Sequence, residues 1–171
     1  VFLFQALHDP ASGRGLDQNL MAFLVAVRAL REWGAQSVTG VLPYLAYSRQ
    51  DQPTRLQREP TTAKLLADLL VEAGLNRLIT WHPHSLRVPG FYNRIPFHGL
   101  EPVGLFANLF RHFAGRDDAI LVAPDAGAAK LITYLARELG ISAAVTSKMR
   151  PEPGQAEVVE IMGDFTGKRV A

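Results

Sequence analysis

Ionisable and amide side chains follow five of the strands that this 171-residue sequence predicts. In chain order they are His8 and Asp9, then Arg49, Gln50 and Asp51, then His82 and His84, then Asp125, and finally Lys148 and Arg150. Ligands of open parallel sheets bind beyond the carboxyl ends of the strands, so we expect these side chains to face one ligand. Arginine and lysine suit phosphate oxygens, whereas carboxylate and imidazole suit Mg²⁺ and its bound waters. The residue types therefore indicate a site for a phosphorylated ligand and a divalent metal.

The familiar phosphate-binding motifs are absent from the sequence. It has no G-x-x-x-x-G-K-[ST] and no G-x-G-x-x-G that opens a helix after a strand. The triplet His82-Pro83-His84 offers an alternative metal, because an H-x-H pair at a strand end can bind Zn²⁺. A zinc site needs further ligands, and His98 and His112 do not complete the set. Magnesium is therefore the metal that we favour.

Apolar stretches alternate with amphipathic stretches along the chain. The pattern predicts strands at residues 1–7, 37–42, 77–81, 95–97, 119–123, 141–146 and 157–162, and helices at residues 19–33, 63–73, 102–113 and 128–139. This alternation favours an α/β fold with parallel sheets and helices on both faces. The pattern restarts after Gly115-Arg116-Asp117-Asp118, which indicates two units, residues 1–100 and residues 101–171.

Composition narrows the class of protein. The 18 basic and 16 acidic residues leave a net charge of +2, too small to indicate nucleic acid or a membrane surface as partner. No apolar run reaches the roughly 18 residues of a membrane-spanning helix. The absence of cysteine excludes a disulfide scaffold and fits a cytoplasmic protein. The chain begins inside an apolar run without an initiator Met and stops where the pattern predicts the start of another strand, so we expect a piece of a longer protein.

Six stretches resemble a known family. They are NLMAFLVAVRAL, VLPYLAYSRQD, REPTTAKLLADLL, PHSLRVPGFY, APDAGAAK and SKMRPEPGQAEVVEIMGDFTGK, and they occur in the order found in ribose-phosphate diphosphokinases, the PRPP synthetases. The resemblance implies two α/β domains of the phosphoribosyltransferase type with the active site between them. It also implies homo-oligomers that use Mg²⁺ to transfer the diphosphoryl group of ATP to C1 of ribose 5-phosphate.

The resemblance also assigns roles to individual residues. It implies that ATP is bound by Arg49, Gln50 and Asp51 of the first unit. It implies catalytic roles for His84, Lys148 and Arg150, and a metal held by His84 and Asp125. Residues 147–155 would form a mobile loop that closes over the phosphates.

The sequence departs from the family pattern in several places. The family has an aspartate where His82 stands and a glutamine where Arg87 stands. The family's F-S-D-G-E segment would lie before Val1, and its D-D-x-x-x-T-G-G/T loop for ribose 5-phosphate would lie after Ala171. Two alternatives therefore stay open: a non-catalytic PRPP-synthetase-like regulatory or assembly subunit, and a phosphoribosyltransferase.

Overall fold

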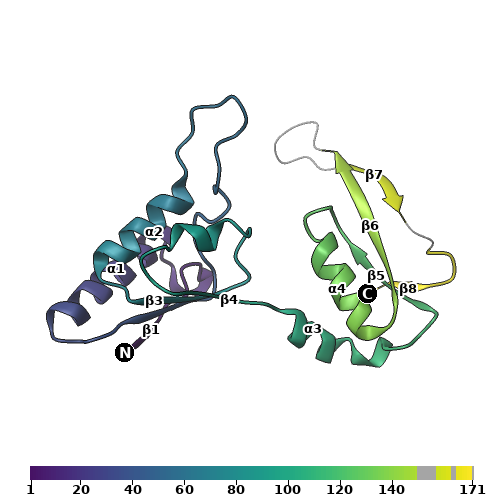
Figure 1. Ribbon diagram of the computed structural model, residues 1–171, viewed down its shortest axis with the longest axis horizontal. Coiled ribbons are helices and arrows are strands. Elements are labelled where there is room, and N and C mark those ends of the chain that lie inside the picture. Colours follow the sequence, from purple (N-terminus) through teal and green to yellow (C-terminus); the bar gives the residue numbers. More distant parts are fainter. Residues whose placement is uncertain (150–156, 163–164, 171) are drawn as a thin grey trace. The chain divides into compact units, whose positions relative to one another are not determined.

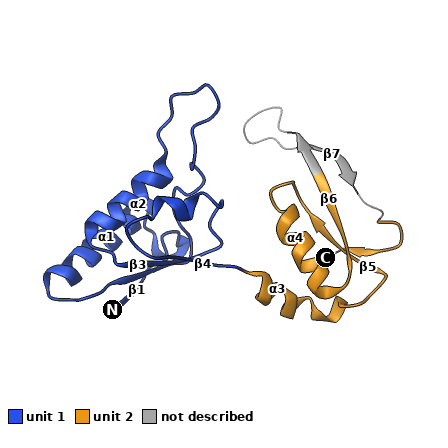
Figure 2. Ribbon diagram, viewed as in Figure 1, with its two compact units in different colours: residues 1–101 blue, residues 102–171 orange. Residues whose placement is uncertain are grey.

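The chain folds into two compact units, Val1–Glu101 and Pro102–Ala171 (Figure 2). The computed structural model describes residues 1–149, 157–162 and 165–170. Each unit is an α/β structure with its own four-stranded sheet. No helix among the described residues is long and apolar enough to cross a membrane.

Unit 1 contains a fully parallel sheet in the order β1-β2-β3-β4 (Figure 1). Its elements are β1 (Phe2–Phe4), the 3-10 helix Pro10–Ser12, α1 (Leu16–Glu32), β2 (Thr39–Leu42), α2 (Thr62–Ala73), β3 (Arg77–Trp81), the 3-10 helix Val88–Phe91 and β4 (Phe97–Leu100). The prediction for β3 is confirmed at both ends, whereas the observed bounds of β1, α1, β2, α2 and β4 differ from the predicted ones by one to three residues. Helix α1 begins before the predicted residue 19 because the Gln18 side chain accepts the Gly15 N–H at 2.9 Å. Strand β4 begins after Pro96, a residue that has no N–H to donate to a ladder.

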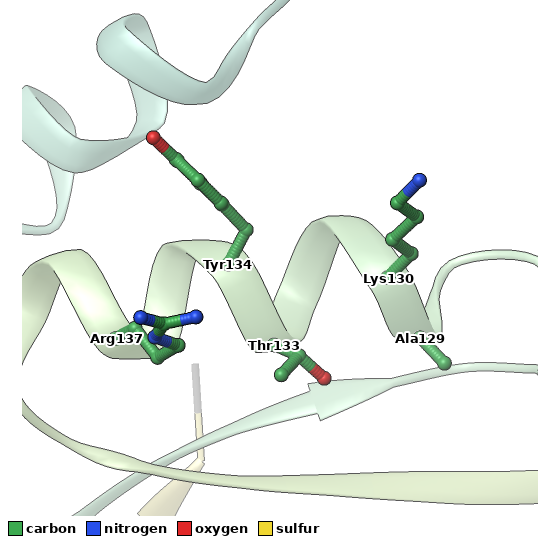
Figure 3. Close-up of a pocket in the computed structure, with 5 residues that line it drawn as sticks. All are labelled: Ala129, Lys130, Thr133, Tyr134 and Arg137. Atoms are coloured by element: carbon green, nitrogen blue, oxygen red, sulfur yellow. The ribbon is translucent and has the colours of Figure 1, made fainter.

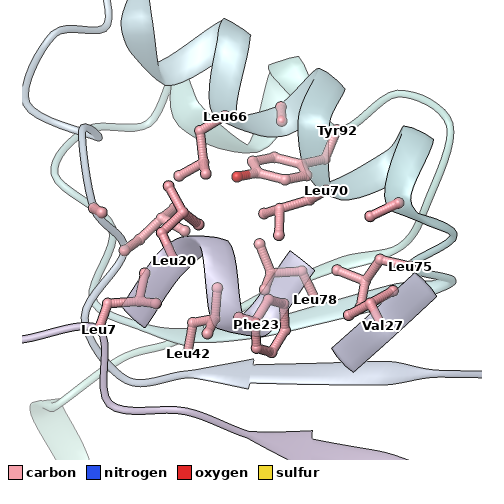
Figure 4. Packing of buried hydrophobic residues seen from close by; sticks show 14 of the residues in the cluster. Leu7, Leu20, Phe23, Val27, Leu42, Leu66, Leu70, Leu75, Leu78 and Tyr92 are labelled. Atoms are coloured by element: carbon pink, nitrogen blue, oxygen red, sulfur yellow. The ribbon is translucent and has the colours of Figure 1, made fainter. Parts of the chain in front are cut away.

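The core of unit 1 lies between the sheet and the two long helices (Figure 4). Helix α1 contributes Phe23 and Val27, and α2 contributes Leu66 and Leu70, all almost fully buried. Gly40 of β2 lies directly beneath this layer, and a Cβ atom there would come within 2.8 Å of Phe23 Cζ. The close approach of helix and sheet therefore depends on a residue without a side chain.

Both helices of unit 1 pack on the same face of its sheet, which corrects the expectation of helices on both faces. The strand order runs steadily from β1 to β4, and consecutive right-handed crossovers that advance in one direction leave their helices on one side. Side chains on the opposite face are accordingly more open. One row across that face consists of Phe4, Val41, Ile79 and His98, and Phe4 is 65% exposed to solvent.

Unit 2 contains a mixed sheet in the order β7-β6-β5-β8. Its elements are α3 (Val103–Leu109), the 3-10 helix Arg111–Phe113, β5 (Ala119–Ala123), α4 (Ala129–Leu139), β6 (Ser142–Met149), β7 (Glu157–Met162) and β8 (Arg169–Val170). Strand β5 runs parallel to β6 and β8, and β6 pairs with β7 in the antiparallel direction. The single helix predicted for residues 102–113 is divided into α3 and a 3-10 turn. The strands predicted for β5 and β7 are confirmed at both ends.

Strand β6 is longer than predicted. It continues from residue 146 to Met149, because β7 pairs with its carboxyl end through a register that changes between Ser147 and Lys148. Ser147–Met149 were expected in a loop and belong instead to this strand. A small core under the sheet joins α3 to α4 through Leu121, Leu135 and Phe106.

Candidate functional site

The first candidate segment is a turn that follows β2. Gln50 N donates to the carbonyl oxygen of Tyr47 at 3.1 Å, and Tyr47 has a left-handed backbone with φ of 58°. The carbonyl oxygen of Gln50 in turn accepts a hydrogen bond from Ala63 N at 3.2 Å, at the start of α2. The backbone on both sides of Arg49 is therefore tied down, while the Arg49 side chain is exposed to solvent.

Tyr47 also connects this turn to the start of α1. Its hydroxyl donates a hydrogen bond to the Asp17 carboxylate, and this bond raises the pKa of the exposed Tyr47 phenol. The tyrosine thereby adds a side-chain attachment to the backbone bonds that hold the turn.

The second candidate segment follows β3. His82 continues the sheet by donating its N–H to the Leu100 carbonyl oxygen at 2.9 Å, and its Nδ1 atom lies 3.2 Å from Oε2 of Glu101. His84, two residues later, is exposed. The two histidines of the H-x-H triplet therefore have different surroundings: His82 contacts a carboxylate and His84 is open to solvent.

A short network joins the two segments. Ser85 Oγ donates a 2.5 Å hydrogen bond to Asp51 Oδ2 and accepts one of 3.2 Å from Arg87 N. The guanidinium atom NH1 of Arg87 lies 3.9 Å from the same carboxylate oxygen. The Asp51 side chain is only 9% exposed. Its hydrogen bond to Ser85 connects the turn that carries Arg49 to the segment that carries His84. These two groups, far apart in sequence, thus lie at one end of the unit 1 sheet.

Sequence reasoning did not foresee the role of Ser85. Its hydroxyl is the only feature that marks it, and serine is common in loops, so no sequence signal would have paired it with Asp51. His8 and Asp9, which also follow a strand, have local roles. Asp9 Oδ1 accepts the Ala11 N–H at 3.0 Å and caps a 3-10 turn, and the His8 ring lies 6.5 Å from that of Tyr44.

In unit 2, Asp125 lies just beyond the end of β5, as predicted from the strand pattern. Its Oδ1 accepts a hydrogen bond from Ala128 N at 3.1 Å, and its main-chain oxygen lies 3.2 Å from the same nitrogen. A Cβ atom on Gly127 would come within 3.2 Å of Asp125 Oδ1, so glycine leaves room for the carboxylate in this turn. The half-buried Asp125 is thus positioned by the turn that begins α4.

The two predicted cations of unit 2 are Lys148 and Arg150. Lys148 is in the last part of β6, paired in register with Val158 of β7. Arg150 and the rest of residues 150–155, which make up most of the predicted mobile loop 147–155, lie outside the described residues. Their assigned roles stay predictions.

The side chains that could bind a metal distinguish between zinc and magnesium. Within the described part of the chain, no three His, Asp or Glu side chains gather in a way that could hold an ion. The H-x-H zinc alternative therefore has no third ligand there, and zinc sites need at least three protein ligands. Magnesium keeps several waters and takes few protein ligands, mostly carboxylate oxygens, so it does not require such a cluster. The assignment of the metal to His84 and Asp125 stays a prediction.

A surface hollow lies along α4 and contains none of the predicted site residues (Figure 3). It is lined by Ala129, Lys130, Thr133, Tyr134 and Arg137, all from this one helix. A hollow formed by a single helix lacks the converging groups of a binding site. We give it no role.

The fold of both units is of the phosphoribosyltransferase type. Residues 1–74 match the family described as the N-terminal domain of ribose phosphate pyrophosphokinase. The chain is homologous to ribose-phosphate pyrophosphokinases, and it spans about half the length of the curated relatives that it matches. This confirms the family resemblance drawn from the sequence.

Individual relatives show the extent of the similarity. A ribose-phosphate pyrophosphokinase of Fusobacterium nucleatum is 35% identical over 170 residues, which cover 98% of this chain and 51% of that protein. Ribose-phosphate pyrophosphokinase 1 of Lactococcus lactis is 39% identical over 171 residues, covering 99% and 51%. The crystal structure of phosphoribosylpyrophosphate synthetase from Mycobacterium smegmatis matches with a TM-score of 0.83 and 31% identity, over 99% of this chain and 52% of that one.

Proposed function

We propose that this chain carries the ATP-binding and metal-binding part of a ribose-phosphate diphosphokinase. The observation that carries the proposal is the similarity over 98% of the chain to relatives that are named for this reaction. The unit 1 network supports it, because the Ser85–Asp51 hydrogen bond holds the segments of Arg49 and His84 at one end of the sheet. Ribose 5-phosphate would be the second substrate. The protein would form a homo-oligomer and would be located in the cytoplasm.

The reaction asks for little covalent chemistry from the protein. The C1 hydroxyl oxygen of ribose 5-phosphate forms a bond to the β-phosphorus of ATP. The bond from that phosphorus to the oxygen bridging to the α-phosphorus breaks, AMP leaves, and the hydroxyl proton passes to water. Negative charge on the transferred phosphoryl oxygens and on the leaving group is the main demand, so catalysis depends on positioning and on positive charge.

The residues of the chain meet these demands in different ways. Arg49 and Gln50, on a turn whose backbone is fixed, contact the nucleotide, and Asp51 completes their motif. His84 is exposed and hydrogen-bonds phosphate oxygens, while Lys148 and Arg150 neutralise charge that develops during transfer. Asp125 and His84 are the residues that would hold Mg²⁺, which would screen the charge of the triphosphate.

The decisive experiment measures PRPP formation by the protein in its complete natural chain, with ATP, ribose 5-phosphate and Mg²⁺. We expect activity that is lost with a chelator and restored by Mg²⁺ or Mn²⁺, and lowered at least a hundredfold in His84→Ala and Asp125→Asn. Arg94→Ala is the matched control, because Arg94 is an exposed arginine paired with Glu72 in the last turn of α2.

A non-catalytic regulatory or assembly subunit is the second candidate, favoured by the presence of His82 where the family has an aspartate. That candidate predicts ATP binding without PRPP formation. A phosphoribosyltransferase would instead consume PRPP when a nitrogenous base is supplied. Absence of both ATP binding and PRPP formation would overturn the proposal.

A further inference from the structure

The carboxylate of Asp51 has two neighbours on the segment after β3. It accepts the Ser85 hydroxyl at 2.5 Å and lies 3.9 Å from Arg87 NH1, while Ser85 Oγ accepts the Arg87 N–H at 3.2 Å. The three residues form a closed loop of contacts that crosses 34 residues of sequence between Asp51 and Ser85. Such a loop sets the position of the Arg87 backbone and biases its side chain toward Asp51.

The same contacts leave most of the arginine available. At 3.9 Å the guanidinium is beyond hydrogen-bonding distance of Asp51, and its side chain is 59% exposed. No hydrogen bond from the guanidinium is found within the described part of the chain, so its donors can serve a ligand. Asp51 has the opposite character: it is almost buried, negatively charged and already bonded, and it is poorly suited to approach a phosphate.

We propose that Arg87 is an additional contact to the phosphate oxygens of the nucleotide and that Asp51 is a positioning residue, which holds Arg87 in place through Ser85. The inference rests on the proposed function, because it takes the phosphates to lie at the strand ends that carry Arg49 and His84. A guanidinium binds phosphate through paired N–H donors in a fixed plane, which a surface lysine does not match. Arg87 thereby adds a positive charge where the family pattern has glutamine.

The test compares ATP with adenosine as ligands of the complete natural chain, in Mg²⁺ and without ribose 5-phosphate. ATP binding is measured by calorimetry and adenosine binding by equilibrium dialysis. We expect Arg87→Ala to weaken ATP binding about tenfold or more, as for loss of a hydrogen bond to a charged group, and to leave adenosine binding within about twofold. Arg87→Lys should recover part of the loss. Arg94→Ala, an exposed arginine of similar accessibility paired with Glu72, should bind both ligands like the wild type.

Asp51's positioning role is tested by a double-mutant cycle. Ser85→Ala removes the hydroxyl that links Asp51 to the segment, so it should weaken ATP binding by less than Arg87→Ala does. The double variant should bind no more weakly than Arg87→Ala alone, because both changes act on one contact. Strictly additive losses would overturn the positioning role of Asp51.

The outcomes separate this inference from the proposed function. If the wild type neither binds ATP nor forms PRPP, the proposed function fails. If the wild type does both and Arg87→Ala binds ATP normally, the function stands and the assignment of Arg87 is wrong. Equal weakening of ATP and adenosine, together with a lower Tm, would show that Arg87 is structural and would also overturn the assignment.

Discussion

His82 Nδ1 lies 3.2 Å from Glu101 Oε2, and this contact joins the end of β3 to the end of β4. His82 also has a left-handed backbone with φ of 38°, a conformation that costs a residue with a Cβ atom about 1 kcal/mol or more. His82 therefore combines a local contact to a carboxylate with backbone strain.

We expect His82→Gly to be more stable than His82→Ala by about 1 kcal/mol. Both variants lose the exposed contact to Glu101, which contributes less than about 1 kcal/mol, but only glycine relieves the strain. Urea denaturation of the two variants measures the difference. Equal stabilities would show that the backbone at this position carries no strain.

Gly40→Ala should lower the free energy of unfolding by about 1–3 kcal/mol, as overpacking of a core usually does. The new Cβ atom would lie 2.8 Å from Phe23 Cζ and 3.0 Å from Leu75 Cδ1. Gly104→Ala is the matched control, because Gly104 lies within α3 with nothing within 4 Å of an added Cβ atom. Circular dichroism during urea denaturation should show Gly104→Ala stabilised by about 0.5–1 kcal/mol.

Tyr92→Phe should stabilise the protein by about 1 kcal/mol. The Tyr92 side chain is buried, and its hydroxyl oxygen has no hydrogen-bond partner among the described residues. The substitution removes this unsatisfied group and keeps the ring that packs 4.9 Å from the Phe97 ring. Tyr44→Phe, at an exposed position, should change stability by less than about 0.5 kcal/mol. A destabilised Tyr92→Phe variant would indicate that the hydroxyl is satisfied by bound water.

The same tyrosine predicts a loss of stability at alkaline pH. Burial raises the pKa of Tyr92 above its ordinary value of about 10. The unfolded chain therefore releases this proton first as the pH rises, so the stability is fully present below about pH 10 and declines above it, by up to about 1.4 kcal/mol per pH unit. Denaturation curves between pH 9 and 11, at roughly half-unit steps, should show a shallower decline in Tyr92→Phe. Identical slopes in the two proteins would contradict the prediction.

Lys148→Ala and Arg150→Ala should lower kcat on the order of a hundredfold or more while weakening ATP binding much less. Their charges would act on negative charge that develops in the transition state. Steady-state kinetics on the complete natural chain, with ATP binding measured separately, tests this. Lys64→Ala is the control, because Lys64 is on α2 and pairs with Asp68 one turn away. If the variants keep kcat within a few-fold of the wild type and only ATP binding is weaker, the two residues bind the nucleotide in the ground state and have no catalytic role.

The sequence by itself determined most of the secondary structure. Strands β3, β5 and β7 begin and end at the predicted residues, because apolar periodicity and the glycines and prolines that interrupt it act over a few neighbouring residues. The alternation of strands and helices likewise predicted the α/β class, and the ordered motifs predicted the family. The start of α1 was misplaced, because the side-chain contact from Gln18 to Gly15 decided it.

Only the tertiary structure decided which distant residues meet. The same-face packing of α1 and α2 follows from strand order, and the Ser85–Asp51 hydrogen bond follows from the adjacency of β2 and β3. Neither depends on the residues nearest in sequence. A pattern that repeats every two or 3.6 residues carries no information on which strand lies beside which, so Asp51 could be expected at a strand end but not paired with Ser85. Long-range pairing belongs to the folded chain, because it is the packing of whole elements that brings such groups within hydrogen-bonding distance.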